Sequence, residues 1–132
     1  MADGGQTIVL TSDTRADINR TRTEQVWEIV ITSTFDADDT TDTTLALPLN
    51  GILRHITFYV PDTTNSITKQ LQINDNSDYN VFDTGELANV DAATTYNYEV
   101  DLPLSGTNDI VVGISGAAGG TTTAMVVTLR GI

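Results

Sequence analysis

Apolar and polar residues alternate in short segments along most of this chain, and Asp, Asn, Thr and Gly residues separate the segments. The clearest alternation lies in residues 24–35. On one face it carries Trp27, Ile29, Ile31 and Phe35. Successive side chains of a β-strand point to opposite faces, so a spacing of two predicts a strand with one face in a hydrophobic core.

Similar patterns predict strands elsewhere in the chain. They cover residues 7–12, 43–49, 52–60, 66–73, 79–83, 95–104, 109–115 and 122–130. β-Branched residues, which favour strands over helices, are frequent in these segments, and turn-forming pairs such as Asn50-Gly51 separate them. We therefore predict an all-β fold, a jelly-roll-like two-sheet antiparallel sandwich with about eight or nine strands and an extended N-terminal arm.

The length of 132 residues fits one domain with a single core. We place the one boundary between residues 1–23, an N-terminal arm or first strand, and residues 24–132, the body of the sandwich. The chain contains no cysteine, so neither disulfides nor thiolate chemistry contribute. Packing and hydrogen bonds between strands must supply the stability.

The chain carries a net charge of −12, from 18 acidic and 6 basic residues. Phosphate backbones are bound through Lys and Arg, so nucleic acid is not an expected partner. The charge is nearly balanced only in the leading segment, which contains Arg15, Arg20 and Arg22. This asymmetry predicts a self-repelling soluble body and an arm that contacts a partner.

The first residues lack the basic and apolar regions of a secretory signal, and no later segment approaches membrane-spanning length. We therefore expect a soluble protein made in the cytoplasm, with no membrane partner. Release from the cell by lysis remains compatible with such a sequence.

Catalytic motifs are hard to find in this chain. His55 is the single histidine, and no nucleophile-elbow sequence surrounds a serine. The many carboxylates cluster in turns, where solvation explains them better than paired-carboxylate catalysis. We therefore predict that the protein is not an enzyme and that it needs no cofactor, apart from a possible calcium ion.

Two acidic turns could offer oxygen ligands to calcium, residues 36–42 and residues 74–78. Neither completes an EF-hand, because the sixth position counted from Asp36 is Thr41 and the twelfth is Leu47. Ordinary solvated turns are the alternative. The candidate metal ligands are Asp36, Asp38, Asp39, Asp75 and Asp78.

Aromatic side chains could form a platform on which a sugar ring stacks. The candidates are Trp27, Tyr59, Tyr79, Tyr96 and Tyr98. Trp27 is in phase with the apolar face of its strand and is assigned to the core. Tyr96 and Tyr98 lie two apart on one face and are the preferred exposed pair, with core or cross-strand packing as the alternative.

Several strand-and-turn segments resemble small structural proteins of tailed double-stranded-DNA bacteriophages. These are residues 49–56 (LNGILRHI), 67–75 (ITKQLQIND) and 81–85 (VFDTG), together with residues 102–106 and 121–131. The resemblance covers about the last two-thirds of the chain and includes no diagnostic site.

The resemblance implies a capsid decoration, or cement, protein. Such a protein sits on the outside of the virion, binds the lattice of the major capsid protein, often as a homotrimer, and stabilises it. An arm that adds a strand to a neighbour's sheet would suit this role. The expected contact residues are Thr7, Ile8, Val9, Leu10, Arg15, Arg20 and Arg22. The alternatives are a carbohydrate- or calcium-binding accessory module and a phage tail or neck component.

Overall fold

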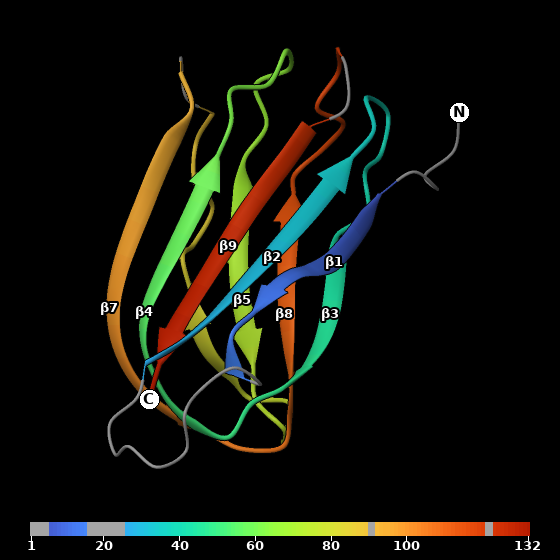
Figure 1. Ribbon diagram of the computed structural model, residues 1–132. Coiled ribbons are helices and arrows are strands. Elements are labelled where there is room, and N and C mark those ends of the chain that lie inside the picture. The colour runs from blue at the N-terminus through green and yellow to red at the C-terminus, as the bar shows by residue number, and fades with distance from the viewer. Residues whose placement is uncertain (1–5, 16–25, 90–91, 121–122) are drawn as a thin grey trace.

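The computed structural model describes residues 6–15, 26–89, 92–120 and 123–132. Within these ranges the chain forms nine strands (Figure 1). They are β1 (Thr7–Asp13), β2 (Trp27–Phe35), β3 (Thr43–Pro48), β4 (Gly51–Val60), β5 (Lys69–Asn74), β6 (Asn80–Asp83), β7 (Thr94–Leu104), β8 (Thr107–Ile114) and β9 (Thr123–Gly131). The described residues include no helix long and apolar enough to cross a membrane.

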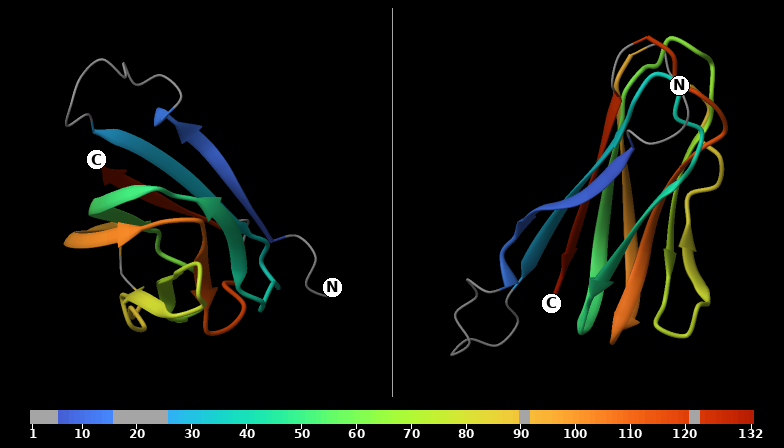
Figure 2. Two further views of the ribbon diagram at one scale, coloured as in Figure 1. Left: turned by 90° about the horizontal axis from the view of Figure 1, so that it is seen from below. Right: turned by 90° about the vertical axis from the view of Figure 1, so that its right-hand side faces the viewer.

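The strands form two antiparallel sheets. The first has the order β1-β2-β9-β4-β7, and the second has the order β3-β8-β5-β6. Figure 2 shows the two sheets facing each other, with β1 at the margin of the first sheet. This arrangement confirms the predicted all-β, two-sheet antiparallel sandwich.

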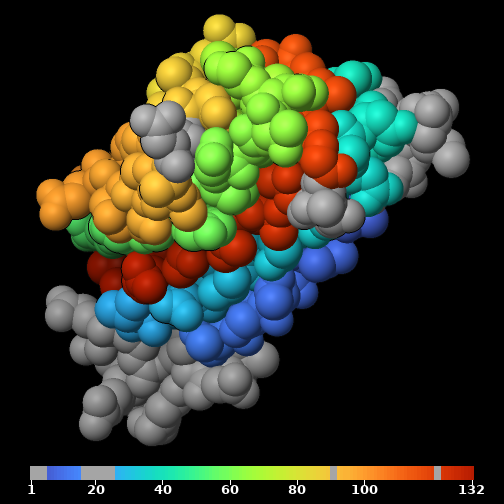
Figure 3. Space-filling view, turned by 90° about the horizontal axis from the view of Figure 1, so that it is seen from above, coloured from blue at the N-terminus to red at the C-terminus, as the bar shows by residue number. Residues whose placement is uncertain are grey.

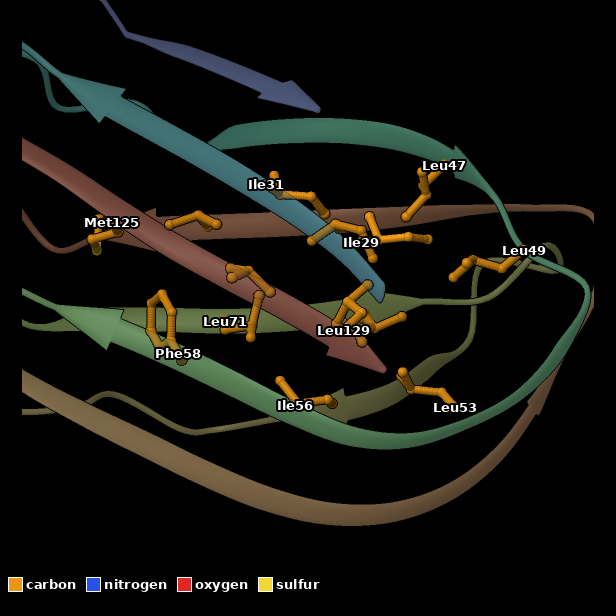
Figure 4. Close-up of a cluster of buried hydrophobic side chains, with 14 of the residues drawn as sticks. Ile29, Ile31, Leu47, Leu49, Leu53, Ile56, Phe58, Leu71, Met125 and Leu129 are labelled. Carbon is orange, nitrogen blue, oxygen red and sulfur yellow. The ribbon is translucent and has the colours of Figure 1, made fainter. Parts of the chain in front are cut away.

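Alternate residues of the central strands fill the space between the sheets (Figure 4). In β2, Trp27, Ile29 and Ile31 are buried while their neighbours are only half-buried, so the predicted core face of this strand is confirmed. Gly131 is needed beside Trp27, because a methyl group there would overlap the indole ring and the carbonyl oxygen of Ile52.

Residues 1–23 were interpreted as an arm or a first strand, and the structure shows a strand for the described part. Strand β1 pairs with β2, with Thr7 opposite Thr34 and Leu10 opposite Ile31. The register shifts between Leu10 and Ser12, which marks a β-bulge. Residues 1–5 and 16–23 lie outside the described residues.

The start of β5 was predicted too early, at residue 66, whereas the strand begins at Lys69. The preceding residues form a loop held by its own hydrogen bonds. The amide of Ile67 donates to the carbonyl of Asn65 (3.0 Å), and the amide of Asn65 donates to the carbonyl of Ala118 (2.8 Å). Because these bonds satisfy the backbone locally, the strand ladder begins later than the apolar pattern does.

We expect Phe58→Ala to destabilise the protein by about 3–5 kcal/mol, since the ring is fully buried and its removal leaves a cavity in the core. The neighbouring Tyr59→Ala is a matched control, because Tyr59 is 38% exposed. Urea unfolding of both variants measures the difference. Equal losses of stability would show that β4 does not present alternate faces to core and solvent.

Candidate functional site

An open two-sheet sandwich leaves four edge strands, here β1 and β7 in the first sheet and β3 and β6 in the second, among the described residues. Three of them carry features that discourage pairing with another chain. Strand β3 ends in Pro48, β7 contains Pro103, and β6 has only 4 residues. Proline lacks an amide hydrogen and short edges offer few donors, so these three edges are protected.

Strand β1 lacks these protections. Its 7 residues, TIVLTSD, include no proline and only one charged residue, which is the last. Val9 is 52% exposed and Leu10 is 42% exposed. Figure 3 shows β1 as an uncovered strip along the margin of the molecule beside β2. An exposed apolar edge of this kind is a template for strand pairing.

The register places the apolar side chains of β1 on both of its faces. Val9 lies opposite Thr32 on the outer face, and Leu10 lies opposite the buried Ile31 on the inner face. At the bulge, the hydroxyl of Thr11 is 2.7 Å from the hydroxyl of Thr32. A docked strand could therefore contact apolar groups on either face in addition to the free backbone.

Arg15 fastens the end of β1 to the second sheet. Its Nη2 lies 2.7 Å from Oδ2 of Asp13, and its Nη1 donates to the carbonyl of Pro48 at the end of β3. The hydrogen bond from Arg15 holds the pKa of Asp13 below its ordinary value. The contact of Arg15 with a partner stays a prediction; within the protein its side chain contacts Asp13 and Pro48. Arg20 and Arg22 lie outside the described residues.

We expect Arg15→Ala to lower the melting temperature at pH 7. The pKa of Asp13 is lowered by folding, so this stabilisation is fully present above the ordinary carboxyl pKa of about 4 and is lost as the pH falls below it, through the lowered pKa of the folded state. Thermal unfolding from pH 7 to pH 2 should show the gap between wild type and variant closing. Asp13→Asn should show the same loss of melting temperature at pH 7 and the same convergence with wild type at low pH. A difference in melting temperature that does not depend on pH would contradict the role of the ion pair.

The acidic turns are organised by hydrogen bonds to the backbone. Oδ2 of Asp39, a fully buried residue, accepts from the amide of Asp36 (2.7 Å). Oδ1 of Asp75 accepts from the amides of Ser77 (2.9 Å) and Tyr79 (3.0 Å). Within the described ranges, no three of the carboxyl and imidazole groups come together as a metal-binding cluster, so the predicted ligands Asp36, Asp38, Asp39, Asp75 and Asp78 are not assembled into one.

Tyr96 and Tyr98 are half-buried and pack against the core, which corrects the expectation of an exposed pair. The ring of Tyr98 contacts Phe82 of β6 edge-to-face, with centroids 5.2 Å apart. This contact closes the sandwich between its β7 and β6 edges. Burial also raises the pKa of the Tyr98 phenol.

A different tyrosine lines a hollow. Tyr59, at the end of β4, borders an open depression of about 340 Å³ together with Pro61, Asp62, Thr64 and Thr123. One partly exposed ring beside hydroxyl and carboxyl groups is a combination that suits a sugar. Tyr59 was one of the predicted candidates, but Tyr96 and Tyr98 were preferred. Alternation of apolar and polar residues separates the two faces of a strand, but it does not show which face another sheet covers.

His55 lies on the outer face of the first sheet. Its Nδ1 is 3.4 Å from the hydroxyl of Thr57 and 3.5 Å from Nη1 of Arg130, which in turn binds Glu28 at 2.9 Å. This is a polar row across β4, β9 and β2.

Lys69 was missed by the sequence analysis. It is the single lysine of the chain and is fully buried. The sequence does indicate that Lys69 is buried, because it is in phase with Ile67, Leu71 and Ile73 on the predicted apolar face.

No protein-family model matches this chain, and no curated protein matches it. Its fold is similar to those of solved structures, at low sequence identity. A CBM4 structure shares 14% identity over 92% of this chain and 73% of the other, with a TM-score of 0.44. The K3 cleaved adhesin domain of Lys-gingipain from Porphyromonas gingivalis shares 11% over 77% and 74%, with a TM-score of 0.44.

A phage protein is also among these structures. The enzymatically active domain of bacteriophage CBA120 tailspike protein 4 shares 13% identity over 96% of this chain, which spans 18% of that domain, with a TM-score of 0.41. At these identities the likeness concerns the β-sandwich fold.

Proposed function

We propose that this protein is a non-enzymatic β-sandwich module that assembles with further copies of itself through the open β1 edge. The main observation that supports this proposal is that β1, among the edge strands described, exposes apolar side chains. It also contains no proline and no charged residue before its last position. A partner strand would pair with the free backbone of β1 and cover Val9 and Leu10.

The finer proposal is that the assembled copies decorate the outside of a phage capsid as a homotrimer. In a ring of three the contact is head-to-tail, so the β1 edge of each copy would pair with a different edge of the next copy; β3 suits this best, because Pro48 removes a donor only at its end. The resemblance of the strand-and-turn segments to phage structural proteins supports this role. The net charge of −12 opposes association between copies, so association should strengthen as salt screens the repulsion.

We expect Val9→Lys combined with Leu10→Lys to convert the assembly to monomers, because two ammonium groups would be desolvated in the paired edge. Light scattering across a range of concentrations measures the mass. The control is Val26→Lys, since Val26 is 63% exposed and precedes β2 instead of lying on an edge. A wild type that stays at 14.2 kDa at all concentrations would contradict self-assembly.

The capsid role has its own test. Wild-type protein should co-sediment with capsid shells of the phage that encodes it, and the double lysine variant should remain in the supernatant. Equal binding by both proteins would contradict a role of the β1 edge in binding to the capsid.

A second candidate function is carbohydrate binding at the Tyr59 hollow, which combines a 38% exposed ring with nearby polar groups. We expect Tyr59→Ala to weaken binding of soluble oligosaccharides about tenfold, or about 1.4 kcal/mol, through loss of the stacking surface. Calorimetry measures the affinity. Tyr79→Ala is the control, since Tyr79 is 71% exposed on the distant β5–β6 turn. No heat of binding with wild type would reject this function.

A further inference from the structure

Lys69 occupies an unusual position for a lysine. It begins β5, where its amide donates to the carbonyl of Leu87 (2.9 Å) and its carbonyl accepts from the amide of Leu87 (2.8 Å). Its side chain is fully buried, and within the part of the chain that the structure describes it forms no ion pair with a carboxylate. Burial of an ammonium group is costly, so the neighbours of Nζ need an explanation.

Two oxygen atoms lie next to the lysine nitrogen. Nζ of Lys69 is 2.8 Å from Oγ1 of Thr63 and 2.5 Å from Oδ1 of Asn89. Since a carbonyl bond is about 1.2 Å long, Nζ is no more than about 4 Å from the amide carbon Cγ of Asn89. Reacting atoms in a near-attack arrangement are about 3–3.5 Å apart, so the amine and the amide carbon are within reach of one another.

The amide of Asn89 is held in a defined orientation. Its Oδ1 also accepts from the amide of Thr63 (3.3 Å), and its Nδ2 donates to Oδ1 of Asp62 (3.2 Å) and to the carbonyl of Thr63 (3.4 Å). The carbonyl oxygen therefore faces Lys69 and the nitrogen faces a carboxylate. That arrangement places a group that can relay a proton beside the nitrogen atom that would leave.

We propose that Lys69 and Asn89 join in an intramolecular amide bond that the folded protein forms by itself. The Nζ–Cγ bond forms, the Cγ–Nδ2 bond breaks, and Nδ2 leaves as ammonia. Asp62 carries a proton from Nζ to Nδ2 and is regenerated. The atoms balance without any redox partner, since one amine and one primary amide give one secondary amide and ammonia.

The surroundings of Lys69 favour this reaction. Burial lowers the pKa of its ammonium group, with the charge of Asp62 acting in the opposite direction, and this favours the neutral amine that can attack a carbonyl. The donors on Oδ1 would stabilise the oxyanion of the tetrahedral intermediate. Asp62 also borders the open hollow beside Tyr59, which gives ammonia a way out.

The bond would connect the start of β5 in the second sheet to the segment that leads from β6 in the same sheet to β7 in the first, at the upper end of the sandwich in Figure 1. The chain has no cysteine, so this bond would be its covalent clamp. A covalent bond at this point would hold the connection between the two sheets against β5, independently of how the β1 edge is used.

Intact mass spectrometry of the folded, then denatured, wild type tests the proposal. The mass should be lower than that of the sequence by one ammonia molecule, about 17 Da. Trypsin should leave residues 55–130 as a single peptide, because it cannot cleave after an acylated lysine and the next sites are Arg54 and Arg130. A succinimide also loses ammonia but leaves Lys69 cleavable.

Matched variants separate the linkage from other modifications. Asn89→Ala and Lys69→Met should have the full mass, Asp62→Ala should remain mostly unlinked, and the exposed Asn97→Ala should keep the loss. Asn89→Ala should also melt at a lower temperature than wild type. Full mass in the folded wild type, or normal tryptic cleavage after Lys69, would overturn the proposal even if a variant failed to fold.

Discussion

The amide and carbonyl groups along the edge strands of an open sandwich must be shielded from other chains or must pair with one, and this constraint shapes all four edges among the described residues. The inner faces of the two sheets form the core, but their burial does not provide hydrogen-bond partners for the amides along the sheet edges. Prolines protect β3 and β7, and shortness protects β6. Strand β1 has no strand paired on its outer side among the residues that the structure describes, and its Val9 and Leu10 are exposed. The proposed assembly follows from this difference between the edges.

The loop end of the sandwich has a different character. There, Thr63 and Asn89 bind the buried amine of Lys69 and Asp62 binds the amide of Asn89, although an apolar residue at the position of Lys69 would pack without any partner. A polar group in a core is costly unless its partners are in place, so these three residues from two segments are fixed near one nitrogen. The proposed amide bond would give this arrangement a chemical role, and it would fix the connection between the two sheets to the start of β5.

Much of the fold could be predicted from spacing alone. The period of two in β2 identified Trp27, Ile29 and Ile31 as core, because burial of a strand face leaves a direct mark on the sequence. Tyr96 and Tyr98 were placed on one face correctly but were expected to be exposed, whereas both pack against the core, and Tyr98 does so through Phe82 on the other sheet. Partners distant in sequence cannot be deduced from a local pattern. For the same reason the sequence did not predict the contact of Lys69 with Asn89 or the hydrogen bond from Arg15 to the carbonyl of Pro48.

Amide hydrogen exchange of the wild type at low and high protein concentration tests the role of the β1 edge most directly. Every second amide of an edge strand points away from its neighbour and is free to pair with another chain. We predict that these amides in β1 exchange more slowly at high concentration, while those at the β7 edge do not change. Identical exchange in β1 at both concentrations, or protection of β7 instead, would contradict the account.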